Sequence, residues 1–471
     1  MDGSPAALWR LSAGDLGRGY RAGRFSPPEV LDAVLAHVAR HNPRLNAIVT
    51  RDDAHAHAAA HASAARFARG APAGPLDGVP VTVKDNIAVA GMRATWGSRL
   101  FAAHVPDRDE LPVARLRAAG AIIVGKTNTP EFAMVGHTDN LVFGPTCNPW
   151  NPALSVGGSS GGAAAAVAAG FGPLALGTDG GGSIRRPASH AGLVGFKPSR
   201  GRVPRADGLP AIFLGHEVVG PIARTVEDAV LAMQTLSPPD ARDGASADWA
   251  DRPFAVPAHL PRCRILHVRA FGDAPVDPEI DLQVARSADA LRALGHRVET
   301  VARSDLADAV NARWMGLAQA GLALMLETRT GWRELLAPTA LANADAGRAM
   351  PATALFDLLR LVEALEARLA GLFAAHDFLL TPAAAALPWP VGTTHPTQID
   401  GRPVGPRGHA VFTGFVNAAG LPAVALPCAP SSAGLPIGMQ LIGRRGDDGR
   451  LLAIAAEVEA DRPWRHRWPA P

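Results

Sequence analysis

Cysteine is scarce in this 471-residue chain, which has only three. Cys147, Cys263 and Cys428 are odd in number and far apart, so they suit neither a disulfide framework nor a zinc site. We therefore expect no metal, and a reducing, cytoplasmic compartment fits best.

Long apolar runs and an excess of one charge are also lacking. The most apolar run, residues 163–176, is rich in Ala and Gly and falls short of the roughly 20 residues that span a membrane. The N-terminus shows no basic-then-apolar signal segment. The net charge is +3, and arginines are scattered among acids instead of forming a basic stripe. We expect a soluble protein that binds neither membranes nor nucleic acid.

Lysine is as rare as cysteine, since only three of the 46 basic residues are lysines. An arginine keeps its proton, whereas a desolvated lysine can lose its proton near neutral pH. Lys84, Lys126 and Lys197 are therefore the candidates for a base, and all lie in the Gly- and Ser-rich third of the chain. Lys126 and Lys197 have the stronger structural alternative, because one follows a predicted strand and the other precedes Pro198.

Apolar periodicity predicts alternating strands and helices. Residues 28–40 place their apolar side chains at helical spacing after the start signal Ser26-Pro27-Pro28, and residues 78–84 alternate with period two. This pattern favours an α/β fold. We expect further helices at 111–119 and 163–169, and amphipathic helices through 282–372. Further strands are expected at 121–125, 263–268, 378–382 and 422–426, and a long surface loop at 235–256.

Two Gly-Ser loops, residues 157–162 and 177–187, stand out as candidates for chemistry. Glycines let a backbone approach a reacting centre and align N–H donors for an oxyanion. From composition alone, a pair of flexible turns is the alternative. Combined with Lys84, the loops supply two hydroxyls, a donor loop and an amine whose pKa can fall on burial, which nucleophilic attack on an amide needs.

The run from 157 to 188 resembles the signature of the amidase signature family. Similar to that family are also residues 77–80, 84–86, 125–128, 131–132, 143–146, 148–150, 195–198, 220–225, 420–423 and 434–438. The resemblance implies a single large α/β/α domain over 1–471, with a central mixed β-sheet flanked by helices. Its expected parts are an N-terminal helical layer (1–65), a catalytic core with the signature (70–230), and substrate-pocket helices with the remaining sheet (260–471).

The resemblance also implies roles for individual residues and no cofactor. Ser183 would be the nucleophile, Ser159 the relay behind a cis peptide, and Lys84 the base. The remaining implied site residues are Gly180, Gly181 and Gly182, with the Ser183 N–H, as the oxyanion hole; Ser160, Asp179 and Arg185 as supports, the last two as an ion pair; and Met134 and Arg186 as candidate substrate contacts. Arg186 could bind a substrate carboxylate or form a structural ion pair. The acyl pocket is expected from 305–375 and 383–410.

Three functions stay open at this point. The first is an amidase that cleaves a small-molecule carboxamide through a Ser183 acyl-enzyme, with a homodimer left open. The second is the glutaminase subunit of a tRNA-dependent amidotransferase, although the chain has no basic tail. The third is an α/β-hydrolase esterase, because residues 157–161 also match a nucleophile elbow around Ser159.

Overall fold

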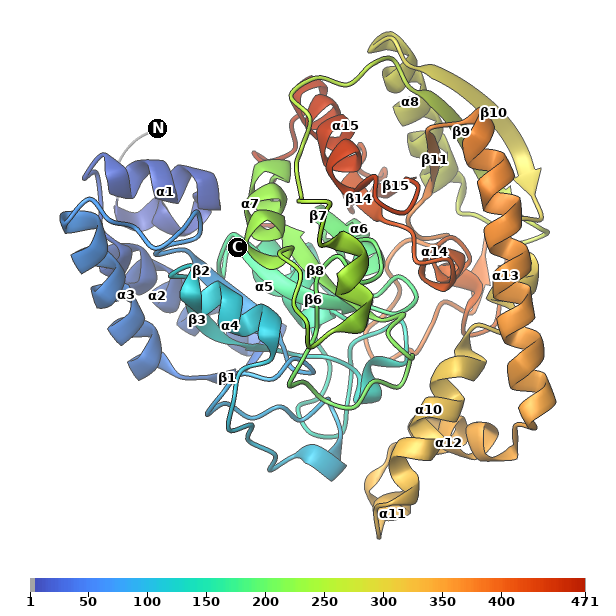
Figure 1. The fold of residues 1–471 in the computed structure, drawn as a ribbon, viewed down its shortest axis with the longest axis horizontal. Helices are drawn as coiled ribbons and strands as arrows, with labels where there is room; N and C mark the ends of the chain where they lie inside the picture. Colours follow the sequence, from blue (N-terminus) through green and yellow to red (C-terminus); the bar gives the residue numbers. More distant parts are fainter. Residues whose placement is uncertain (1–4, 471) are drawn as a thin grey trace.

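The computed structural model describes residues 5–470 and is built on an 11-stranded sheet in the order β1-β3-β2-β6-β8-β7-β14-β15-β11-β9-β10 (Figure 1). Its strands are β1 (Ile48–Arg51), β2 (Pro80–Lys84), β3 (Ile122–Thr127), β6 (Leu174–Asp179), β7 (Val194–Lys197), β8 (Val218–Ala223), β9 (Arg264–Phe271), β10 (Arg297–Ser304), β11 (Phe378–Pro382), β14 (Ala423–Pro427) and β15 (Gly438–Ile442). Short ladders join β4 (Cys147–Asn148) to β5 (Asn151–Ser155), and β12 (Gln398–Ile399) to β13 (Arg402–Pro403).

Parallel and antiparallel ladders alternate in blocks across this sheet. Strand β2 is parallel to both β3 and β6, and β9 is parallel to both β10 and β11. The other ladders are antiparallel. The predicted α/β fold with a central mixed sheet is therefore confirmed.

Helices cover the sheet along its length. They are α1 (Ala13–Arg21), α2 (Pro27–Leu45), α3 (Asp53–Ala68), α4 (Leu111–Ala118), α5 (Gly161–Ala169), α6 (Arg185–Ala191), α7 (Val226–Leu236), α8 (Pro278–Ala293), α9 (Asp308–Asn311), α10 (Met315–Glu327), α11 (Trp332–Leu335), α12 (Pro338–Ala349), α13 (Ala352–Ala375), α14 (Gly414–Ala418) and α15 (Asp448–Asp461), with 3-10 turns at Pro5–Arg10, Arg99–Phe101, Glu131–Ala133, Gly244–Trp249 and Gly408–Ala410. Helix α2 begins at Pro27, as the start signal predicted, and Ser26 caps it in a capping box with Glu29. Among residues 5–470, no helix combines the length and hydropathy needed to cross a bilayer.

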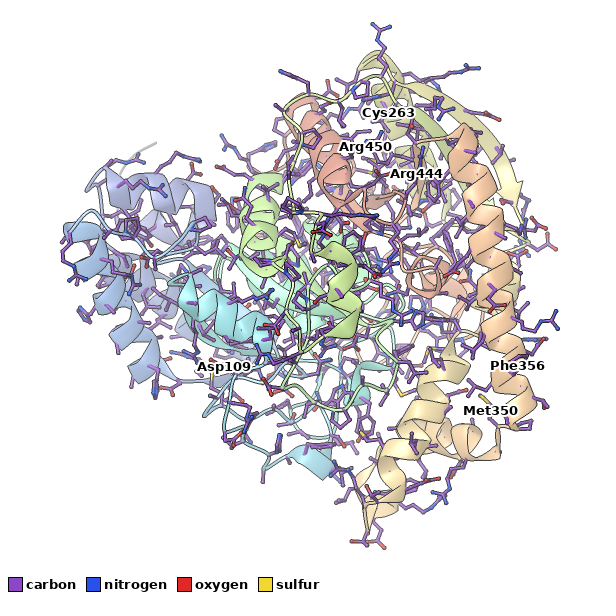
Figure 2. All side chains as sticks on the ribbon, viewed as in Figure 1. Asp109, Cys263, Met350, Phe356, Arg444 and Arg450 are labelled. Carbon is purple, nitrogen blue, oxygen red and sulfur yellow. The ribbon has the colours of Figure 1, made fainter. Side chains whose placement is uncertain are left out.

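The buried apolar side chains form two clusters. The larger surrounds β2, β3, β6 and β8 with helices α2, α5 and α7, and the smaller joins α10 and α13 to β9 and α14. Figure 1 shows α10 to α13 as an arm at one end of the molecule, and Figure 2 shows Met350 and Phe356 on this arm. Ile184 of the second Gly-Ser loop belongs to the larger cluster, and Trp314 of the smaller cluster donates to the Gly180 carbonyl of the same loop. This loop therefore lies where the two clusters meet.

One sequence prediction is wrong in part, and another is confirmed with an addition. The expected helical stretch 282–372 is interrupted by β10, because α8 ends before Gly295, whose φ is +95°, and the chain returns as a strand parallel to β9. The 235–256 loop contains a 3-10 turn, and its Trp249 is buried under Arg202 and Arg445.

Strand β2 carries Lys84 into the interior. The period-two pattern correctly predicted a strand, but all five of its residues are buried, because β3 and β6 flank it and both faces are covered. Lys84 is 0% exposed. A lysine at this position contacts other protein groups and not bulk solvent.

Gly162 in α5 tests the tight packing of the first Gly-Ser loop. A Cβ at this position would meet the backbone of Asn128, with its carbonyl oxygen 2.6 Å away. We expect Gly162→Ala to lower the free energy of unfolding by about 1–3 kcal/mol, since overpacking forces the backbone to shift. Gly371→Ala, in the open face of α13, is the matched control and should be neutral or stabilising by up to about 1 kcal/mol. Denaturant unfolding measures both, and equal stabilities would contradict the packing described.

Candidate active site

Lys84 lies against two hydroxyl groups. Its Nζ donates to Ser159 Oγ at 2.7 Å and to Thr178 Oγ1 at 2.8 Å. Burial lowers the pKa of Lys84 to about 7, although Glu217 and Asp179 act to raise it. A substantial fraction of Lys84 is therefore neutral, and able to accept a proton, near neutral pH.

The first Gly-Ser loop connects Lys84 to the second. The Gly158–Ser159 peptide is cis, and Ser159 is fully buried. The N–H of Ser160 donates to Ser183 O at 3.1 Å, and its hydroxyl donates to Thr178 O at 3.1 Å. Ser160 thereby ties the two loops together.

Ser183 lies at the edge of a small cavity and is 7% exposed. In the described part of the chain its hydroxyl has no hydrogen-bond partner, so the structure joins Lys84 to Ser159 but not Ser159 to Ser183. The cavity is lined by Ala133, Met134, Val135, Gly180, Gly181, Ser183, Arg186, Phe213, Glu217, Met315 and Arg407.

The peptide groups before Ser183 are oriented by side chains that lie more than 130 positions later in the sequence. The carbonyls of Asp179, Gly180 and Gly181 accept, in that order, from Asn417 Nδ2 at 2.7 Å, Trp314 Nε1 at 2.8 Å and Thr413 Oγ1 at 2.8 Å. A trans peptide points its N–H away from its C=O. The N–H groups of Gly180 and Gly181 therefore point away from these side chains, and neither they nor the Ser183 N–H have an acceptor within residues 5–470.

Gly182 differs from its neighbours. Its N–H donates to Asp179 Oδ1 at 2.6 Å, so it is not free for an oxyanion. The predicted donor set of Gly180, Gly181 and Gly182 is therefore wrong in its third member, because the Asp179 carboxylate accepts the hydrogen bond from the Gly182 N–H.

Asp179 and Arg185 form the expected ion pair in the interior. Arg185 Nη2 and Nε donate to the two Asp179 oxygens at 2.9 and 3.0 Å, and both residues are 0% exposed. Although burial acts to raise it, the pKa of Asp179 lies well below its ordinary value because of Arg185. Arg185 also donates to Gln440 Oε1 at 2.6 Å and to Asn417 Oδ1 at 2.5 Å, so the pair links the loop to β15 and α14.

Arg186 binds carbonyl groups of both loops. Its guanidinium donates to Gly181 O and, at 3.4 Å, to Gly158 O, and it is 1% exposed. Neither of the two alternatives from the sequence fits fully, since its hydrogen-bond partners among residues 5–470 are these carbonyls and the Thr413 hydroxyl, and not a carboxylate. Burial, and after it the neighbouring Arg407, lower its pKa to about 9.

A sequence profile described as Amidase matches residues 29–452, which is most of the chain. The chain belongs to the amidase signature family.

Relatives within the family carry different names. A glutamyl-tRNA(Gln) amidotransferase subunit of Synechococcus sp. (strain CC9605) is 38% identical over 478 residues, covering 94% of this chain and 96% of its own. The acylamidase of Rhodococcus erythropolis is 33% identical over 478 residues, covering 98% and 97%. The structure of a bacterial aryl acylamidase of the amidase signature family has a TM-score of 0.88 at 31% identity and covers 96% of each chain.

Some residues around this amidase signature site were predicted from the sequence, and others were not. Met134 lines the cavity, as expected, and the predicted pocket segments 305–375 and 383–410 contribute Met315 and Arg407. Thr178 stands beside Asp179 in the second Gly-Ser loop and could have been suspected as a second partner for a lysine. Trp314, Thr413 and Asn417 carry no motif, because they act on the loop through long-range contacts.

Trp314→Phe tests the orientation of the loop. The phenyl ring keeps most of the volume but removes the donor to Gly180 O. We expect kcat/KM for an aryl amide to fall about 10- to 100-fold, somewhat less than the loss of an oxyanion donor itself. Trp249→Phe is the matched control, because it removes a buried indole bond to Arg200 O far along the chain from the loop. Equal losses in the two variants would contradict a specific role for Trp314.

Proposed function

We propose that this chain hydrolyses a small-molecule carboxamide to a carboxylate and ammonia or an amine, with Ser183 as nucleophile, Ser159 as relay and Lys84 as base. The observation that carries the proposal is the buried Lys84, whose pKa is about 7 and whose Nζ donates to Ser159 Oγ at 2.7 Å. A serine is too weakly acidic to attack an amide without such a base.

The proposed reaction moves one proton along this chain of groups. Neutral Lys84 takes the proton of Ser159 while Ser159 takes that of Ser183, and Ser183 Oγ bonds to the substrate carbonyl carbon. The N–H groups of Gly180, Gly181 and Ser183 stabilise the oxyanion. The proton then passes to the departing nitrogen as the C–N bond breaks. A water molecule then attacks the acyl-enzyme and gives its proton to Lys84 through the same side chains. The carboxylate product leaves, and Ser183 is restored.

The second candidate is a glutaminase subunit of an amidotransferase, favoured by the name of the 38% identical relative. Such a site must hold the α-ammonium group of glutamine, which needs a free carboxylate or several acceptors. Glu217 lines the cavity but accepts from Arg205 Nη1 at 2.8 Å, and Asp179 is held by Arg185. This charge arrangement supports the small-molecule amidase. Ammonia release from L-glutamine and from its deamino analogue glutaramate separates the two, because only the glutaminase should prefer glutamine.

The third candidate, an esterase with Ser159 as nucleophile, fits the site poorly. A nucleophile elbow presents its serine at the surface of the active site. Ser159 is instead fully buried and hydrogen-bonded to Lys84, whereas Ser183 borders the cavity.

The three cysteines are all unpaired, which supports the proposed cytoplasmic location.

The two serines should respond differently to substitution. We expect Ser183→Ala to abolish both turnover and covalent labelling by a fluorophosphonate, since the attacking oxygen is lost. Ser159→Ala should keep slow turnover, because water can partly replace a relay. Mass spectrometry locates the label. Labelling of Ser183→Ala, together with none of Ser159→Ala, would favour the esterase instead.

The base predicts a pH profile. Because only neutral Lys84 accepts a proton, kcat/KM should rise about tenfold per pH unit below about 7 and level off above it. Lys84→Arg should be nearly as inactive as Lys84→Ala, since a guanidinium stays protonated.

Lys197 is the matched control for this titration. Burial also lowers its pKa to about 7, but among the residues that the structure describes its Nζ donates only to the carbonyls of Pro198 and Leu421. Lys197→Arg should keep the acidic limb, measured per folded enzyme. Loss of the limb in Lys197→Arg, or near-normal turnover in Lys84→Arg, would exclude Lys84 as the base.

A further inference from the structure

Arg407 places a guanidinium without a counter-charge in the cavity beside Ser183. Its Nη2 lies 3.6 Å from the position that a Cβ on Gly181 would take. Within residues 5–470 its side chain makes no hydrogen bond and no ion pair. Burial lowers its pKa to about 10, so it is charged at neutral pH.

The nearby carboxylates are already bound by other arginines. Asp179 is held by Arg185 at 2.9 Å, and Glu217 by Arg205 at 2.8 Å. Neither is therefore free to neutralise Arg407, which keeps its positive charge uncompensated by the protein.

Arg186 adds a second guanidinium to the same cavity. Its partners are neutral groups, the carbonyls of Gly158 and Gly181 and the Thr413 hydroxyl. Two guanidiniums in a partly desolvated space repel each other, and an anion between or beside them would remove this penalty. The nearby carboxylates of the protein are bound by other arginines, so an anionic ligand would have to supply this charge.

The surroundings of Arg407 show how a ligand could reach it. Met134, Phe213 and Met315 give the Ser183 cavity apolar walls. Arg407 also lines an adjoining surface depression, together with Asn311, Ala312, Gly405, Pro406, Gly408, Ala410 and Val411. Arg407 therefore lies between Ser183 and solvent, and the apolar walls of the cavity lie on the Ser183 side of it.

We propose that Arg407 binds a carboxylate of the substrate, so that the preferred substrates are amides with a carboxylate joined to the scissile carboxamide by a short hydrocarbon spacer. This inference rests on the proposed hydrolysis at Ser183. A guanidinium matches a carboxylate with two parallel hydrogen bonds. The carboxylate-binding role considered for Arg186 thus passes to Arg407, because Arg186 is engaged with the loops.

The test compares matched acids and esters. Succinic, glutaric and adipic mono-p-nitroanilides are assayed against their methyl esters, and N-acetyl-4-aminobenzoate against its methyl ester, so that the carboxylate lies on either side of the scissile bond. We expect the wild type to prefer the acid in at least one pair by about 10- to 100-fold in kcat/KM, the range of a charge-assisted hydrogen bond. In Arg407→Gln the acid should lose that factor relative to the ester. Exposed Arg402→Gln, in β13, is the control and should keep the preference.

The outcomes separate this proposal from the proposed function. Fluorophosphonate labelling of Ser183 with no acid preference in any pair, or equal losses for acid and ester in Arg407→Gln, would overturn the role of Arg407 alone. Failure to label Ser183 would overturn the proposed function. Calorimetric binding of the acids to Ser183→Ala and to Ser183→Ala with Arg407→Gln gives a readout without turnover. Weaker acid binding in the double variant supports the proposal, and equal binding contradicts it.

Discussion

The buried pair of Asp179 and Arg185 is the interaction on which the arrangement of the site depends. Asp179 accepts from the N–H groups of Gly182 and Ile184, which fixes the turn that presents Ser183. Arg185 extends the same network to Gln440 and Asn417. Removing one partner of such a pair typically costs about 3–5 kcal/mol, because the other charge is left buried alone. The loop geometry and the stability of the fold are therefore coupled through one carboxylate.

Lysine and arginine divide the work in this chain according to their chemistry. Arg185 and Arg186 are buried and use their several fixed N–H donors to hold loops, which requires a permanent charge and a planar fork. Lys84 is buried for the opposite reason, since desolvation makes its proton easy to lose. The scarcity of lysine is consistent with this division: all three lysines are buried, and burial lowers the pKa of each.

Sequence reasoning found the local parts of this structure and missed those that depend on distant contacts. Strands β2, β9, β11 and β14 follow from short apolar or alternating runs. Of the motif residues, Lys84 and Ser159 lie in hydrogen-bond contact, and the Ser183 carbonyl accepts from the N–H of Ser160. The sequence pattern does not predict strand β6, because its apolar start continues the Ala-rich run of α5 and its end belongs to the glycine-rich loop. The engaged N–H of Gly182 and the unpaired Arg407 could not be predicted either, because both depend on where separate segments meet in space.

The contacts that orient the loop come from late in the chain. Asn417 donates to the Asp179 carbonyl and lies 238 positions after Asp179. Gln440 accepts from Arg185 and lies 255 positions after Arg185. While the chain is being synthesised, Lys84, Ser159 and Ser183 leave the ribosome long before these partners exist. The nascent chain thus carries the three residues proposed for catalysis without the contacts that position them. Hydrolytic activity accordingly belongs to the finished polypeptide, and a product terminated early would be inert.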